Sequence, residues 1–126
     1  MAFIFFNENP KGKRTGDCTV RAISLALGVS WNEAHRILCQ RSEDLGDMPS
    51  SNVVWASVLR SAGFYRAVIP NDCPDCYTVS DFARDHPWGI YVLKTQDHVL
   101  CQIDGNWYDS WNSGNEIVEY YFYLEE

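Results

Sequence analysis

The residue pattern changes near residue 89, and this change constrains the fold more than any other feature of the sequence. Residues 89–124 are rich in Tyr, Trp, Val and Ile, and four segments in this region predict β-strands: 90–95, 98–103, 107–111 and 117–124. Turn residues separate these segments, so consecutive strands are expected to pair antiparallel. Helical periodicity dominates the earlier part of the chain. The sequence therefore predicts an α+β fold in which N-terminal helices cover one face of a C-terminal antiparallel sheet.

Before residue 89, the pattern predicts a short strand, a polar loop and four helices. These elements are expected at 3–6 (strand), 7–16 (loop), 18–27, 30–41, 51–62 and 80–85 (helices). Asp17 is expected to cap the first helix and Gly28 to end it, while Ser30 and Glu33 form a capping pair for the second. Pro87 ends the fourth helix, because the residue before a proline avoids helical geometry.

Length and charge narrow the classes of protein to which this chain can belong. Its 126 residues predict one domain, residues 1–126. The formal net charge of −7 argues against a nucleic-acid partner. The apolar run at residues 2–6 is far too short to cross a membrane, and no signal peptide or anchor is expected. Five cysteines without an export signal indicate a reducing compartment, so we expect a cytoplasmic protein.

Cys18 stands at the predicted start of a buried helix and is a candidate nucleophile. The unpaired amides at a helix start favour the thiolate, whereas the neighbouring Asp17 disfavours it by charge repulsion unless its carboxylate is occupied. A lone cysteine in this position is most often a small buried apolar residue. A nucleophilic thiolate also needs a base, and the base needs a third group that orients its ring.

His98 and Asp109 meet these needs if the strands on either side of residues 104 and 105 form a hairpin. Asp104 and Gly105 are a favoured pair for the centre of a two-residue turn. Leu100 then faces Asp109, and His98 lies diagonally from Asp109 with the Cα atoms about 7 Å apart. A three-residue loop would instead put Asp109 on the opposite face from His98. The turn therefore decides whether the two side chains can meet.

The order of these residues resembles that of papain-like cysteine peptidases: a cysteine at a helix start, a histidine on a later strand, and an acidic or amide residue on the next. The segment Asp109-Ser110-Trp111 is similar to the Asn-Ser-Trp segment of papain-like enzymes. The resemblance implies that Cys18 is the nucleophile, His98 the general base and acid, Asp109 the orienting residue, and Trp111 a shield for the bond between them.

The segment around the cysteine is similar to other members of the same superfamily. Residues 16–24 resemble the Cys-x-x-Arg-Ala segment of OTU-type deubiquitinases, and the Asp-Cys pair also occurs in NlpC-type cell-wall hydrolases. The chain departs from papain-like peptidases at Gly12, which stands where they carry an oxyanion-stabilising Gln. The Cys18 amide can donate one hydrogen bond to an oxyanion, and Asn9 or Asn7 is the candidate for a second.

Two further groups of residues have alternative interpretations. Arg21, in the first helix, is expected to be an ion-pair partner rather than a substrate contact. Cys73 and Cys76 have the spacing of half a zinc site, and His35 and Cys39 are candidates for the other half. No spacing rule joins the halves, so our leading interpretation includes no metal and no cofactor.

We expect a thiol hydrolase, a cysteine peptidase or isopeptidase, that cleaves a peptide or related amide bond through an acyl-enzyme on Cys18. Its partner would be a peptide or protein substrate. The alternative is a non-catalytic papain-like binding or adaptor module, stabilised by zinc at Cys73 and Cys76. An acyl transferase with the same triad is a third reading, because the sequence does not distinguish water from an amine as the acceptor.

Overall fold

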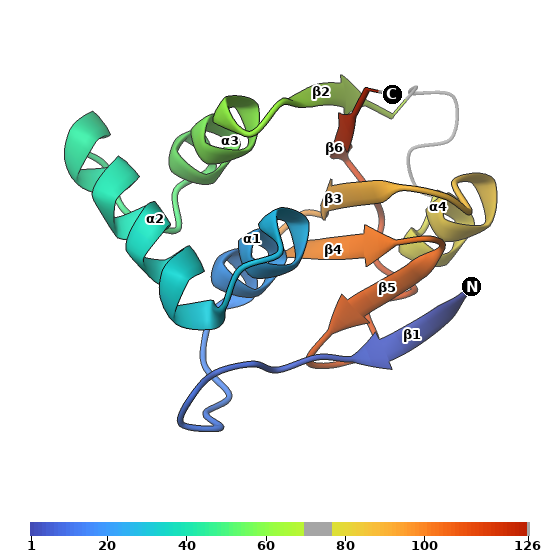
Figure 1. Cartoon of the computed structure of the whole chain (residues 1–126). Helices are drawn as coiled ribbons and strands as arrows, with labels where there is room; N and C mark the ends of the chain where they lie inside the picture. Colours follow the sequence, from blue (N-terminus) through green and yellow to red (C-terminus); the bar gives the residue numbers. More distant parts are fainter. Residues whose placement is uncertain (70–76, 126) are drawn as a thin grey trace.

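The computed structural model describes residues 1–69 and 77–125 (Figure 1). Within these ranges the chain forms four helices and six strands. In chain order the elements are β1 (Ala2–Phe5), α1 (Cys18–Leu27), α2 (Trp31–Leu45), α3 (Asn52–Ser61), β2 (Phe64–Val68), α4 (Val79–Asp85), β3 (Ile90–Lys94), β4 (Val99–Ile103), β5 (Asn106–Asp109) and β6 (Tyr120–Leu124). The α+β class predicted from the sequence is confirmed, with most helices in the N-terminal half.

The sheet is mixed, so the prediction of a purely antiparallel sheet is wrong. Its strand order is β1-β5-β4-β3-β6-β2, and β1 runs parallel to β5 while the other neighbours are antiparallel. The strand β6 pairs with β3 rather than with β5, because the long link 110–119 lets the chain cross the sheet. The strand β2, which the sequence analysis did not predict, forms one edge next to β6.

Helices cover both faces of the sheet, which corrects the prediction that they cover one. The helices α1, α2 and α3 gather on one face and α4 lies on the other (Figure 1). Successive strand residues point to opposite faces. Val92 and Cys101 accordingly pack with the α1–α3 core, whereas Leu93 and Leu100 pack with the α4 core around Phe82. The helix that begins at Cys18 is thereby held against β4, next to the predicted histidine.

The ends of the helices show which of the predicted capping interactions form. Ser30 accepts a hydrogen bond from the Glu33 amide at 3.1 Å, as predicted, and α2 then continues to Leu45, beyond the predicted end. Asp17 occupies the N-cap position of α1, but its side chain makes no capping bond, so that prediction is wrong. The helix α4 begins at Val79 with a capping box formed by Thr78 and Asp81. No helix in the described ranges is long and apolar enough to span a bilayer.

The hairpin β4–β5 has the register predicted from its turn. Ile103 pairs with Asn106, and Asp104 and Gly105 form the two-residue connection. Their φ angles are +50° and +78°, the left-handed values that a type I′ turn requires at both central positions. The hairpin therefore brings the residue before β4, His98, alongside the end of β5.

Candidate active site

Cys18 and His98 line a single cavity of about 610 Å³ at the start of α1. Cys18 is the first residue of α1 and His98 directly precedes β4. Cys18 is half-buried and is one of the residues that line the cavity. The cavity is also lined by Arg14, Thr15, Gly16, Arg21, Asp97, Ser110 and Trp111. The predicted nucleophile and the predicted base therefore face the same solvent-accessible space.

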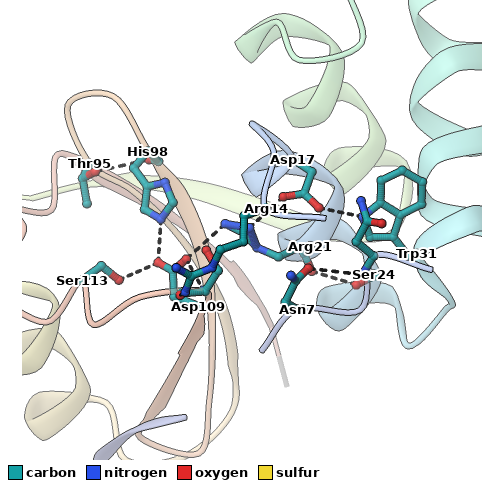
Figure 2. A network of polar contacts seen from close by, with 12 residues as sticks. Asn7, Arg14, Asp17, Arg21, Ser24, Trp31, Thr95, His98, Asp109 and Ser113 are labelled. Atoms are coloured by element: carbon teal, nitrogen blue, oxygen red, sulfur yellow. Dashed lines mark hydrogen bonds and ion pairs between the residues drawn. The ribbon is translucent and has the colours of Figure 1, made fainter. Parts of the chain in front are cut away.

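His98 is bound to the carboxylate of Asp109, as the hairpin register predicts (Figure 2). Nε2 of His98 lies 2.6 Å from Oδ2 of Asp109. A carboxylate only accepts hydrogen bonds, so Nε2 is the donor. Because Nε2 is engaged with Asp109, Nδ1 is the ring nitrogen that remains for Cys18. Asp109 thus orients the ring in the way that a catalytic base requires.

The Asp109 carboxylate is almost fully buried, with 1% of its surface exposed, and both oxygen atoms are bound. Oδ2 accepts from Ser113 Oγ at 2.6 Å in addition to His98. Oδ1 accepts from the Ser110 amide at 2.8 Å and from Arg21 at 3.2 Å. Four donors compensate for the burial of this charge, as a buried carboxylate requires. The position of Asp109 is therefore fixed independently of His98.

Cys18 and His98 each shift the pKa of the other. Burial alone raises the pKa of the Cys18 thiol, but hydrogen bonds with His98 and the Val99 main chain, together with the charge of His98, bring the pKa below its ordinary value. Burial lowers the pKa of His98, but hydrogen bonds and charge interactions with Asp109 and Cys18 raise it to about 9. Both shifts act in the direction of a thiolate beside an imidazolium.

Arg21 connects the helix α1 to Asp109. Its two terminal nitrogens bind Asp17 at 2.8 Å and Asp109 at 3.2 Å (Figure 2), and all three side chains are buried. The other Asp17 oxygen accepts a hydrogen bond from the Trp31 indole at 2.9 Å. The Asp17 carboxylate is therefore occupied by a cation and an indole rather than by the helix amides. This pairing offsets the repulsion between Asp17 and a Cys18 thiolate. The sequence-based expectation that Arg21 is an ion-pair partner is confirmed.

Trp111 lies at the cavity beside His98. The centroids of the two rings are 5.1 Å apart and the ring planes are inclined by 38°. The Trp111 side chain is partly exposed, at 45%. The residue implied by the resemblance to be a shield is thus in contact with the imidazole.

Asn9 is not brought to the cavity. Its side-chain oxygen accepts hydrogen bonds from the main-chain amides of Lys11 and Lys13, at 2.8 and 3.4 Å, and the residue is not among those that line the cavity. Asn side chains bind amides two residues further on in this way in many turns. Asn7 likewise donates to the Lys13 carbonyl at 3.2 Å. Both asparagines thus bind the main chain of the loop, and the oxyanion contact of Asn9 stays a prediction.

The sequence analysis did not find several residues that support the site. Ser113 binds Asp109 but lies in a polar loop whose composition carries no signal for such a role. The loop is held by Asn112, whose Oδ1 accepts from the Trp107 indole at 3.1 Å and from the Gly114 amide at 3.0 Å. A Cβ atom on Gly114 would lie 2.8 Å from the Trp107 ring, so the close packing there requires a glycine. These contacts depend on tertiary structure.

The candidate zinc site is partly outside the described residues, because Cys73 and Cys76 lie in the segment 70–76. His35 and Cys39 lie together on α2, with Nε2 and Sγ 3.7 Å apart, as their spacing predicts. Within residues 1–69 and 77–125, no group of three or more potential metal ligands occurs. Zinc binding by the four residues remains a prediction.

Comparison with known proteins identifies no relative. No protein-family model, curated protein or solved structure matches this chain.

Proposed function

We propose that this chain is a papain-like thiol hydrolase that cleaves a peptide or related amide bond through an acyl-enzyme on Cys18. The observation that carries this proposal is the arrangement of His98, which is bound to a buried carboxylate and lines the same cavity as the half-buried Cys18. The chain order of the three residues and the contact between Trp111 and His98 further support it.

The proposed reaction has two steps. The Cys18 thiolate attacks the carbonyl carbon of the substrate, and the His98 imidazolium donates its proton to the departing amine as the C–N bond breaks. A water molecule then attacks the thioester while neutral His98 accepts its proton. The C–S bond breaks, and the acid product and free Cys18 are released. Asp109 keeps the ring oriented in both steps.

The architecture is compatible with this function. A helix that starts with the nucleophile packs against a strand pair that carries the base and the orienting residue. We propose that this arrangement is papain-like and belongs to a single domain of residues 1–126. A cavity of about 610 Å³ falls within the range of small-molecule sites, so it would hold a few residues of a peptide or protein substrate.

The acyl transfer can be tested without a known substrate. The activated ester p-nitrophenyl acetate should give a burst of p-nitrophenol and an acetyl group on Cys18, detected by mass spectrometry of the peptide 15–21. The Cys18→Ala chain should give no burst, and His98→Ala should give a much slower one. Cys39→Ala is the matched control, because Cys39 is also a free, half-buried cysteine. A burst that persists in Cys18→Ala would contradict the proposal.

A peptide library separates the proposed hydrolase from the alternatives. A hydrolase produces new carboxyl termini in water, and this cleavage disappears in Cys18→Ala. A transferase produces amides when an amine is added, in place of free acids. Intact peptides together with an unreactive Cys18 would favour a binding module.

A further inference from the structure

The loop between β1 and α1 is basic, although the chain as a whole is acidic. The formal net charge is −7, yet Lys11, Lys13 and Arg14 occupy three of the four positions 11–14. All three side chains are exposed. In the part of the chain that the structure describes, none of them forms an ion pair, whereas the buried Arg21 has two carboxylate partners. The loop therefore concentrates unneutralised positive charge beside the cavity.

Arg14 is the member of this group that lines the cavity together with Cys18 and His98. One of its terminal nitrogens donates a hydrogen bond at 2.7 Å to the carbonyl of Ser110, which also lines the cavity, and this bond anchors the side chain there. A guanidinium group has five N–H donors in a planar fork, and this bond uses one of them. A carboxylate, the common anionic group of peptides, matches the geometry of such a fork.

The charges around the cavity favour an anion near Arg14. Asp17 and Asp109 are both paired with Arg21, and Asp109 also binds His98, so the charges of the two carboxylates are compensated in part. Asp97 also lines the cavity, from the turn that precedes His98. An acidic group is therefore attracted by Arg14 and repelled by Asp97.

We propose that Arg14 binds a carboxylate of the substrate next to the scissile bond, so that the enzyme prefers acidic peptides. This inference rests on the proposed thiol hydrolase function, because Cys18 defines where the bond is cleaved. Arg14 acts here on the substrate and not on the triad.

Two alkylating reagents of the same chemistry and different charge test this proposal on the intact chain. Iodoacetate and iodoacetamide both form a C–S bond with Cys18 and release iodide, but only iodoacetate carries a carboxylate. The rates are measured on the tryptic peptide 15–21, which isolates Cys18 from the other cysteines. In Arg14→Gln the corresponding peptide is 14–21. We expect this substitution to lower the ratio of the iodoacetate rate to the iodoacetamide rate about twofold to fivefold at low salt.

Lys13→Gln is the matched control, because Lys13 belongs to the same loop but does not line the cavity. Lys13→Gln should keep the wild-type ratio of the iodoacetate rate to the iodoacetamide rate. Arg14→Lys keeps the positive charge, so its ratio should lie between those of the wild type and Arg14→Gln. An unchanged ratio in Arg14→Gln, or an equal loss in Lys13→Gln, would overturn the role of Arg14. If Cys18 of the wild-type chain reacts with neither reagent, the proposed hydrolase function itself fails, which is a distinguishable result.

Discussion

Replacement of Arg21 by methionine is expected to destabilise the protein strongly. Methionine keeps the aliphatic part of the side chain and removes the charge. Asp17 and Asp109 then remain buried without their shared cation, since their side chains are 5% and 1% exposed. Breaking a buried ion pair by removing one partner costs about 3–5 kcal/mol, because an uncompensated charge is left behind.

The expected loss of free energy of unfolding can be converted to a decrease in the melting temperature, Tm. The entropy of unfolding is about 2.1 cal/mol/K per residue, so for 126 residues a loss of 1 kcal/mol lowers Tm by about 4 °C. A loss of 3–5 kcal/mol therefore corresponds to about 11–19 °C. Urea unfolding followed by tryptophan fluorescence and by circular dichroism gives the free energy, and calorimetry gives Tm.

Arg36→Met is the matched control for Arg21→Met. Arg36 pairs with Glu33 on the surface of α2, where both side chains are exposed, and such pairs contribute at most about 1 kcal/mol. In an Asp17→Asn background, Arg21→Met should cost less than in the wild type, because one of the two orphaned charges is already absent. A loss below about 1 kcal/mol for Arg21→Met, equal to that of Arg36→Met, would refute this account of the network.

Three more predictions concern the same region. Ser113→Ala should cost about 1–3 kcal/mol in urea unfolding, since Asp109 loses a buried donor; no change would show that the bond is dispensable. Gly105→Ala should cost about 1–2 kcal/mol because φ at this position is +78°; an unchanged Tm would argue against the type I′ turn. Because folding raises the pKa of His98 to about 9, its contribution to the free energy of unfolding should be complete below pH 6.5 and should decline as the pH rises through 9. Urea unfolding of the wild type and of His98→Gln across pH 6–10 measures this contribution. A contribution that grows with pH would contradict the prediction.

Local sequence signals predicted the part of the site that depends on local geometry. The pair Asp104-Gly105 sets the turn, the turn sets the register, and the register brings Asp109 within reach of His98. Local signals also predicted the start of α1, which begins at Cys18. Short-range rules suffice here because few residues separate the interacting groups.

Signals of this kind could not predict contacts between distant segments. Nothing in the residue pattern shows that β1 pairs with β5, or that β6 crosses to β3, since any strand can pair with any free edge. The sequence indicated that Arg21 needs an anionic partner, but Asp109 as that partner follows from packing. The position of Asn9 outside the residues that line the cavity likewise depends on how the loop folds, where its Oδ1 accepts a hydrogen bond from the Lys11 amide.

The central claim is that Cys18 and His98 form an interacting thiolate–imidazolium pair. NMR titration of the imidazole C2 proton of His98, assigned by comparison with His98→Gln, tests this most directly. We predict an apparent pKa of about 9 in the wild type and a lower value in Cys18→Ala, in which the thiolate no longer stabilises the imidazolium. A His98 pKa near 6.5 that is the same in both chains would contradict the claim.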